Sequence, residues 1–352
     1  MGFVKTLACL CYFMVPVLGI LLPIPLCDIR RNLTPEQVEL CKQFKEKHLD
    51  LLLDAKFKSE FECKKQFAGR RWNCTMPPSS NVTPLLLPRL PLATKETSYL
   101  YASMSAAMMH TISRGCMAGT LKNYCACSEE GRPRDLPKNQ IWGGCGDNLP
   151  YGYKFSKMFT DAGEQLTETS LTGFSRVLMN LHNNEAGRWA VYEKSFIKCR
   201  CHGVSTNCPT KTCYRQLGRF HTVAKHLETL HQDAVHVKLQ KDVPDAEEEG
   251  NVEMKLVETS PGFTKKSTKD LVYISDSPSY CERSIRTGSY GVAGRPCTKE
   301  GNIHTDCEAM CCQKGHYSKR EIVRTKCGCK LIWCCEVKCN ICENEQNNHY
   351  CK

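Results

Sequence analysis

The chain carries few of the features that mark an enzyme or a membrane protein. After residue 22, no segment of the 352 residues is apolar enough to span a bilayer, which takes about 20 apolar residues. The sequence also shows no glycine-rich phosphate loop, metal-ligand triad or paired-carboxylate motif. These absences argue against a nucleotide-dependent enzyme, a metalloenzyme and a two-carboxylate hydrolase.

Cysteine is missing from residues 214–280 but abundant on either side. Twelve cysteines lie in residues 27–213 and twelve more in residues 281–351. Because each cluster is even, each can close its own disulfides. The pattern predicts a helical N-terminal domain, a linker containing an acidic stretch, and a cysteine-rich C-terminal domain. We expect them over residues 20–240, 241–270 and 271–352.

The first residues resemble a secretory signal peptide. Lys5 precedes an apolar run over residues 6–22, which Pro16 and Gly19 interrupt. We therefore expect residues 1–19 to be removed and the chain to be secreted. An uncleaved membrane anchor is the alternative, but the run is short and contains two helix breakers.

The cysteine content agrees with secretion. Without Cys9 and Cys11, 24 of the 26 cysteines remain, enough for up to twelve disulfides. In an oxidising compartment this number predicts a disulfide framework. Zinc is the competing interpretation, because two closely spaced pairs could begin a metal site: Cys327 with Cys329, and Cys339 with Cys342.

Glycosylation sequons and basic charge also suit an extracellular protein. The sequons lie at Asn32, Asn73 and Asn81. The formal net charge of +11 favours polyanions such as sulfated glycans over nucleic acid. The basic residues form three clusters, each of which alone is more typical of a solvated face: Arg70 with Arg71; Lys265, Lys266 and Lys269; and Lys319, Arg320, Arg324 and Lys326.

The N-terminal half contains several helix signals. Thr34, Pro35 and Gln37 have the pattern of a capping box with proline at the first helical position. Further helices are predicted over residues 98–114, 170–183, 185–196 and 222–233. In the C-terminal domain, twelve cysteines in 72 residues leave few core positions, so we expect short strands and hairpins held by disulfides.

Residues 199–213 predict a disulfide-braced hairpin. Their four cysteines, at positions 199, 201, 208 and 213, are nested as in a two-stranded hairpin with two rungs. A hairpin this short buries almost nothing of its own, so its tip is the expected working part. Ser205 and Thr206 supply hydroxyl groups there that are open to chemical modification.

Residues 327–342 repeat this design. Six cysteines would give two nested rungs and an adjacent pair at the tip: Cys327 with Cys342, Cys329 with Cys339, and Cys334 beside Cys335. Adjacent cysteines can pair with each other only in a strained turn. Trp333 beside them is either an exposed contact residue or a core residue, and the composition does not decide between the two.

Together these features resemble the Wnt family of secreted signalling glycoproteins. The resemblance runs from Cys27 to Lys352, and residues 142–161 are similar to its Wnt-11-like branch. It is carried by short segments in a fixed order: Gly69-Arg-Arg-Trp-Asn-Cys74, Trp142-Gly-Gly-Cys145, His182-Asn-Asn-Glu-Ala-Gly-Arg188, Cys199-Arg-Cys-His-Gly-Val-Ser205, Lys211-Thr-Cys213 and Trp333-Cys-Cys335.

The resemblance implies an α+β, disulfide-rich, two-domain hand, in which residues 199–213 form a thumb hairpin and residues 327–342 a finger hairpin. It implies a developmental signalling ligand, without a cofactor or enzymatic activity, that binds the cysteine-rich domain of Frizzled receptors. Ser205 would carry a mono-unsaturated fatty acyl ester added by the acyltransferase Porcupine. The implied receptor contacts are Val204, Ser205, Thr206, Leu331, Ile332, Trp333, Cys334, Cys335 and Val337.

Further partners follow from the same resemblance. An acyl chain of about 16 carbons, at ~0.8 kcal/mol per buried methylene, could contribute ~10 kcal/mol gross in an apolar groove. Such a chain lowers solubility, so a carrier is implied, and the family uses Wntless. A co-receptor of the LDL-receptor-related or receptor tyrosine kinase type is also implied, as is heparan sulfate in the extracellular matrix.

The resemblance also implies disulfides that the sequence alone could not choose. In the N-terminal domain they are Cys63–Cys74, Cys116–Cys125, Cys127–Cys145, Cys199–Cys213 and Cys201–Cys208, which leaves Cys27 and Cys41 over. In the C-terminal domain they are Cys281–Cys312, Cys297–Cys307 and Cys311–Cys351.

The sequence departs from the family pattern at both tips. In the thumb, Thr206 and Asn207 replace the usual Gly-Ser after the serine. A β-branched residue in that turn crowds the Ser205 hydroxyl and could reduce the efficiency of acylation. In the finger, Leu331 and Ile332 replace the usual Phe-His, which keeps the tip apolar but removes an imidazole.

Other interpretations fit parts of the sequence less well. Gly203-Val-Ser205 beside His202 resembles a hydrolase nucleophile elbow, but Asn207 replaces the second glycine. A structural matrix protein would explain the basic charge, but not an exposed fingertip. Residues 182–188 carry His, Glu and Arg; we interpret them as the junction of two helices, where asparagines act as caps.

Overall fold

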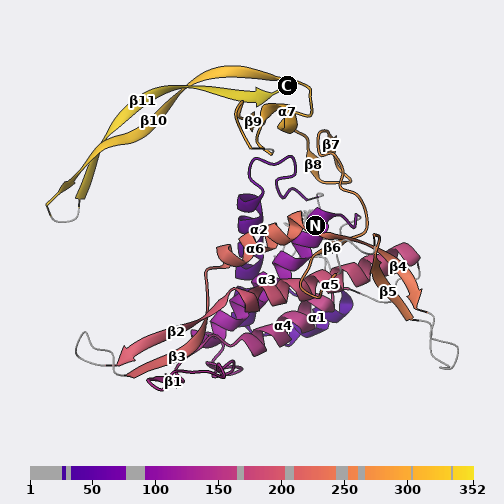
Figure 1. Cartoon of the computed structure of the whole chain (residues 1–352), viewed down its shortest axis with the longest axis vertical. Helices are drawn as coiled ribbons and strands as arrows, with labels where there is room; N and C mark the ends of the chain where they lie inside the picture. Colours follow the sequence, from indigo (N-terminus) through magenta and orange to yellow (C-terminus); the bar gives the residue numbers. More distant parts are fainter. Residues whose placement is uncertain are drawn as a thin grey trace, which may run out of the picture.

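The computed structural model describes residues 26–28, 33–76, 92–164, 170–202, 210–242, 253–260, 266–302, 304–333 and 336–352. A helical body is followed along the chain by a cysteine-rich part, and a long hairpin extends from each toward the same side of the molecule (Figure 1). Within the described ranges, every helix is too short or too polar to cross a membrane. The predicted fold class is confirmed.

The helical body is built around α3, whose side chains are almost all buried. Helices α2, α4, α5 and α6 pack around it. The core clusters join apolar residues of these helices, among them Tyr99, Met109, Ala186 and Leu227. In the described part of the body the helices are α1 (Pro35–Lys42), α2 (Glu46–Gln66), α3 (Lys95–Met117), α4 (Leu149–Asp161), α5 (Leu171–Glu193) and α6 (Phe220–Gln232).

The capping-box prediction for α1 is confirmed. The Thr34 hydroxyl accepts the Gln37 N–H at 3.2 Å, and the Gln37 side chain accepts the Thr34 N–H at 3.1 Å. The helices predicted over residues 98–114 and 222–233 correspond to α3 and α6 with slightly different ends. Helices α2 and α4 were not predicted, although Asn148 before Leu149 and Pro150 is an N-cap signal for α4.

The predicted junction of two helices at residues 182–188 is wrong, because α5 runs without a break through this segment. The two asparagines bond to other elements instead of capping helix ends. Asn183 exchanges two hydrogen bonds of 2.9 Å with the backbone of Val272, and Asn184 donates to Asp161. The helix predicted to reach Phe196 ends at Glu193, and Phe196 lies instead in the strand Ser195–His202.

Two small sheets lie on the helical body. The first has the order β1-β3-β2 and contains the thumb hairpin; its strands are β1 (Gln140–Trp142), β2 (Ser195–His202) and β3 (Thr210–Leu217). The second has the order β5-β4-β6, with β4 (Val235–Asp242), β5 (Glu253–Glu258) and β6 (Val272–Tyr273). Leu256 of β5 is buried beside Met179 of α5. Part of the predicted linker therefore belongs to a strand that packs on the body.

The cysteine-rich part has a small core in which cysteines outnumber other residues: Val292, Cys297, Cys307, Met310, Cys311 and Cys351. Its elements are β7 (Arg283–Ser284), β8 (Ser289–Tyr290), β9 (Pro296–Cys297), α7 (Cys307–Met310), β10 (His316–Ile332) and β11 (Glu336–Cys351). Strands β10 and β11 pair over nearly their whole length. The finger hairpin is thus longer than residues 327–342.

Ten disulfides join described cysteines, in the pairs that the sequence resemblance and the nested spacing imply. They are Cys27–Cys41, Cys63–Cys74, Cys116–Cys125, Cys127–Cys145, Cys199–Cys213, Cys281–Cys312, Cys297–Cys307, Cys311–Cys351, Cys327–Cys342 and Cys329–Cys339. Cys201 is also disulfide-bonded, and its expected partner Cys208 lies outside the described residues. The cysteines considered for zinc are oxidised in these pairs, so they offer no thiolate ligands.

Candidate functional site: two braced hairpins

The finger hairpin is a two-stranded ribbon with two disulfide rungs near its outer end. The register of the strands shifts between Cys327 and Lys330; Cys327–Cys342 connects the strands at the body side of this shift, and Cys329–Cys339 connects them within it. Gly328 takes a positive φ of 56° in this irregular stretch, which suits glycine. An isolated two-stranded hairpin is only marginally stable in water, so covalent rungs are needed to hold its end in place.

The outer end of the finger exposes apolar side chains. Trp333 is 96% exposed, Leu331 is 77% exposed, and Val337 lies opposite Leu331 with 59% exposed. Ile332 is 41% exposed beside them. Trp333 is therefore not a core residue, and the open question from the sequence is resolved in favour of exposure. Cys334 and Cys335 lie outside the described residues.

Polar contacts across the finger shaft hold the two strands together nearer the body. Glu321 accepts hydrogen bonds from Asn348 at 2.7 Å and Tyr350 at 2.9 Å, and it pairs with Lys319 at 3.1 Å. The hydrogen bond from Asn348 is the largest cause of a lowered pKa of the Glu321 carboxyl, and the contacts with Lys319 and Tyr350 lower this pKa further. Arg324 pairs with Glu343 on the other strand at 2.7 Å.

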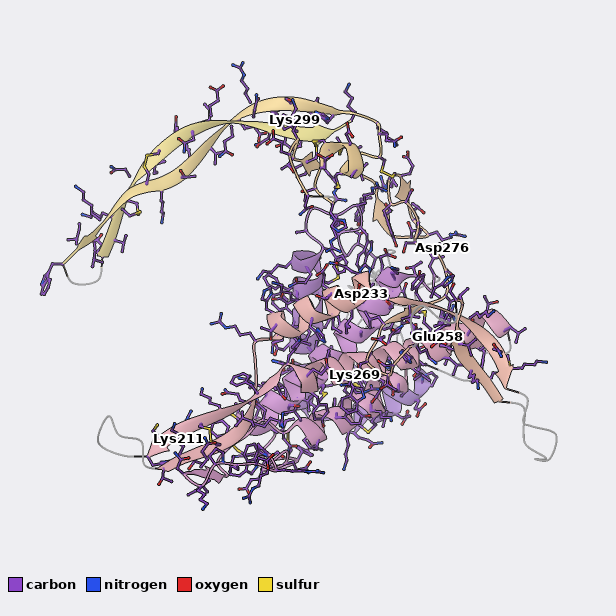
Figure 2. The ribbon with its side chains drawn as sticks, in the orientation of Figure 1. Lys211, Asp233, Glu258, Lys269, Asp276 and Lys299 are labelled. Carbon is purple, nitrogen blue, oxygen red and sulfur yellow. A yellow bond between two sulfur atoms is a disulfide. The ribbon has the colours of Figure 1, made fainter. Side chains whose placement is uncertain are left out.

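The thumb hairpin is braced by the Cys199–Cys213 rung, whose two residues lie directly opposite each other. His202 bonds to the Thr212 hydroxyl at 2.6 Å across the two strands, which helps to hold them together. Figure 2 shows Lys211 on the outer part of this hairpin. Val204, Ser205 and Thr206 lie outside the described residues.

Asp147 anchors the base of the thumb. Its buried carboxylate accepts the Leu217 N–H at 2.7 Å, and Arg114 of α3 lies 3.1 Å away. Burial raises the pKa of this carboxyl, while the Leu217 hydrogen bond and Arg114 oppose the rise. The thumb is thereby tied to the central helix. Asp147 was not predicted from the sequence, although it stands directly before the Asn148 cap of α4.

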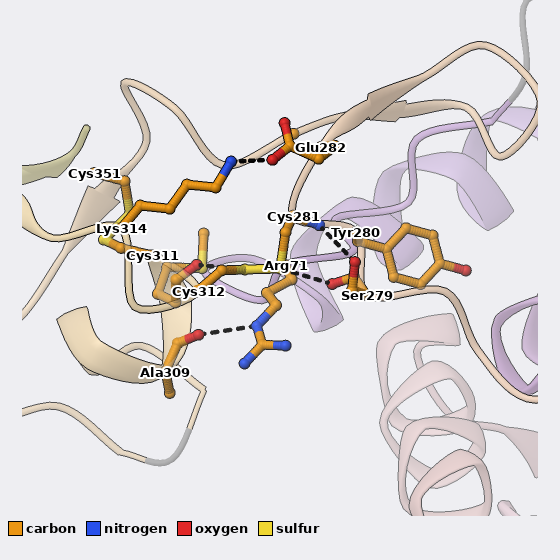
Figure 3. The surroundings of a disulfide bond; sticks show 12 residues. Arg71, Ser279, Tyr280, Cys281, Glu282, Ala309, Cys311, Cys312, Lys314 and Cys351 are labelled. Carbon is orange, nitrogen blue, oxygen red and sulfur yellow. Dashed lines mark hydrogen bonds and ion pairs between the residues drawn. A yellow bond between two sulfur atoms is a disulfide. The ribbon is translucent and has the colours of Figure 1, made fainter.

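The finger is joined to the body through the Arg70-Arg71 segment. Arg71 donates to the carbonyl of Ala309 at 2.9 Å, near the Cys281–Cys312 disulfide (Figure 3). Arg295 donates in return to the carbonyl of Arg71 at 2.6 Å. Arg70 forms an ion pair with Glu228 of α6. The motif around Trp72 thus holds the cysteine-rich part on the helical body.

The predicted basic clusters are partly neutralised by acidic neighbours. Lys269 pairs with Glu193 at 2.7 Å and lies over the Trp189 ring, and Arg320 lies 3.7 Å from Glu345. These contacts resemble a solvated, charge-balanced face more than a dedicated anion site. Of the glycosylation sequons, Asn73 is half-buried, whereas Asn32 and Asn81 lie outside the described residues.

The finger shaft exposes two isoleucines that were not predicted as contact residues from the sequence. Ile341 is 72% exposed and lies on the same face of β11 as Val337, because side chains four apart on a strand point the same way. Ile322 of β10 is 67% exposed. Alternation along residues 337–341 is the signal that could have found Ile341.

Among the described residues, two disulfide-braced hairpins extend from the body, and the outer end of the finger exposes Leu331, Trp333 and Val337. Comparison with known proteins gives the family: the chain belongs to the Wnt family, whose model, described as wnt family, matches residues 29–352. The members of this family are secreted signalling ligands rather than enzymes, and this chain is a Wnt signalling ligand.

Several relatives show the same similarity. Wnt-5a of Pleurodeles waltl is 38% identical over 330 residues, which cover 93% of this chain and 88% of the relative. Human Wnt-5a is also 38% identical, with 93% and 83% covered. A chain of the human WLS complex with WNT8A is similar in structure, with a TM-score of 0.58, 31% identity, and coverage of 86% of this chain and 93% of that chain. These relatives do not confirm the Wnt-11-like branch.

Proposed function

We propose that this Wnt ligand holds the cysteine-rich domain of a Frizzled receptor between its two hairpins. An acylated Ser205 on the thumb would enter an apolar groove of the receptor, and the fingertip would make the second contact. Trp333 carries the proposal, because a tryptophan 96% exposed on a disulfide-braced hairpin is costly in water unless a partner covers it.

The two contacts have different physical roles. Burial of an acyl chain of about 16 carbons supplies ~10 kcal/mol gross, more than the polar thumb tip could provide. The same apolar chain would enter any similar groove, so it discriminates poorly between receptors. The fingertip residues Leu331, Trp333 and Val337 supply shape, and with Ile332 in place of an imidazole they would shift receptor preference. Cys334 and Cys335 belong to the same proposed contact.

Secretion of the acylated chain requires a carrier. A single acyl chain gives only marginal, reversible membrane binding and lowers solubility in water. We infer that Porcupine adds the ester and that Wntless carries the chain, and the similarity to a chain of the WLS–WNT8A complex supports the second inference. The net charge of +11 supports retention by heparan sulfate in the matrix, and a co-receptor of the LDL-receptor-related or receptor tyrosine kinase type would complete signalling.

Mass spectrometry of the secreted chain tests the proposal. The peptide spanning residues 199–213 should carry the mass of a mono-unsaturated fatty acyl group on Ser205. A serine-reactive hydrolase probe should leave Ser205 unlabelled, in contrast to a catalytic serine. An unmodified Ser205 in a fully active secreted chain would overturn the proposal.

A further inference from the structure

Helix α2 presents an apolar stripe to solvent. Leu53, Phe57 and Phe61 are 44%, 64% and 53% exposed, and they follow one another at intervals of four residues on one face. The rings of Phe57 and Phe61 stack with their centroids 5.9 Å apart. Scattered exposed apolar residues are ordinary, but three large ones in a row on a helix mark a contact surface.

The rest of α2 explains why this face is not needed for folding. The opposite face is buried against the helical body and includes Leu52, Ala55, Ser59 and Cys63. That face alone anchors the helix, because α2 packs on α3 and α6. The apolar stripe therefore remains after the helix has made its contacts within the chain.

Charges of opposite sign lie at the two ends of the stripe. Asp50 is exposed one turn before Leu53, where the exposed Lys47 lies 3.8 Å from its carboxylate, and Lys64 is exposed one turn after Phe61. Positions 50, 53, 57, 61 and 64 recur at three or four residues, the spacing of one helix face. Over about 21 Å of the helix, this face therefore carries an acidic residue first, then the apolar residues, and then a basic residue.

We propose that α2 pairs antiparallel with α2 of a second copy of this chain, about a two-fold axis at Phe57. In this arrangement Phe57 meets Phe57, Leu53 meets Phe61, and Asp50 meets Lys64. The Leu53–Phe61 and Asp50–Lys64 contacts then each occur twice and the Phe57–Phe57 contact lies on the axis, which is the self-complementarity that a two-fold interface requires. Aromatic residues at the centre and charges at the rim are also the usual composition of a protein interface.

The charge order favours a second copy over a lipid surface. A membrane would meet both ends of the stripe at once and would gain nothing from an acidic residue at one end and a basic residue at the other. An antiparallel copy reverses the order and places each charge against its opposite. The central pairing depends only on α2, so it is independent of the hairpin tips.

Sedimentation velocity on the full chain tests the pairing. The chain carries Ser205→Ala, so that an acyl group cannot cause association. We expect a concentration-dependent dimer whose Kd rises at least about tenfold in Phe57→Ser. Asp50→Lys or Lys64→Asp alone should raise the Kd severalfold at low salt, and the double exchange should restore it to within about twofold. Ile285→Ser, which removes an apolar residue 74% exposed elsewhere, should change nothing.

Three outcomes would overturn the proposal. The chain could remain monomeric up to about 100 µM, a concentration at which a functional contact should form. A dimer could form that Phe57→Ser does not weaken or that the double charge exchange does not restore. A monomer could bind phosphatidylcholine vesicles through Phe57, which would assign the stripe to a membrane. Circular dichroism of each variant verifies the fold, which these exposed positions should not affect.

Discussion

Arg188 of α5 forms a bidentate ion pair with Asp161 at the end of α4. Its Nη1 and Nη2 each lie 3.0 Å from one of the two carboxylate oxygens, and its Nε donates to Glu185 at 2.9 Å. Arg188 is 1% exposed, and it also donates to the hydroxyl of Ser105 on α3. The guanidinium therefore connects three helices of the body at one point.

Removal of this guanidinium should destabilise the body strongly. Arg188→Ala leaves the Asp161 carboxylate without its cationic partner in a largely buried site, which typically costs about 3–5 kcal/mol. Urea unfolding of the secreted chain, followed by circular dichroism, measures the loss. Arg286→Ala, at an exposed arginine, is the matched control and should cost under about 1 kcal/mol. A similar loss in both variants would show that the buried pair has no special role.

Gly187 lies one position before Arg188 and permits close helix packing. A Cβ at this position would stand 2.1 Å from the carbonyl oxygen of Ala102 on α3. Gly187→Ala should therefore push α5 away from α3 and cost about 1–3 kcal/mol. In Gly143→Ala the new Cβ meets no atom within 4 Å, so the urea concentration at the midpoint of unfolding should equal that of the parent. Equal midpoints for the two variants would contradict the close approach.

The buried His110 predicts a pH dependence of stability. Burial lowers its pKa from 6.5 to about 4, and its Nε2 bonds to the carbonyl of Gly218 at 2.9 Å. Because the folded pKa is depressed, the unfolded chain binds a proton between pH 6.5 and about 4 that the folded chain does not. The stabilising contribution is complete above pH 6.5 and is lost as the pH falls toward 4.

Substitution of His110 isolates this contribution. The parent should lose about 3 kcal/mol more than His110→Gln between pH 7 and pH 4, as measured by urea unfolding at each pH. His231, whose pKa burial lowers to about 3, contributes equally to both chains and cancels in the difference. Parallel curves for parent and His110→Gln would refute the assignment.

The outer rung of the finger should matter for binding rather than for folding of the body. Replacement of Cys329 and Cys339 together by serine leaves the Cys327–Cys342 rung and the helical core untouched. We expect receptor-domain affinity to fall at least about tenfold because the tip loses its fixed position. The thermal midpoint of the helical body should shift by less than about 2 °C. Unchanged affinity would mean that the Cys329–Cys339 disulfide is not needed to position the fingertip for binding.

The sequence predicted best what depends on short-range patterns. The capping box at Thr34 and the nested rungs at Cys327 and Cys329 follow from residue types at fixed offsets, and the structure contains both. The helix junction at Asn183 and Asn184 failed because their cap preference yielded to tertiary partners on β6 and α4. The exposure of Phe57 could not be predicted, since it depends on which face of α2 packs on α3.

Binding of the Frizzled cysteine-rich domain by the parent, Ser205→Ala and Trp333→Ala tests the two-contact account most directly. Surface plasmon resonance should show an affinity at least about 100-fold weaker for Ser205→Ala and at least about tenfold weaker for Trp333→Ala. Each loss should be independent of the other, because the two tips belong to separate hairpins. Affinities within about twofold of the parent for both variants would contradict the account.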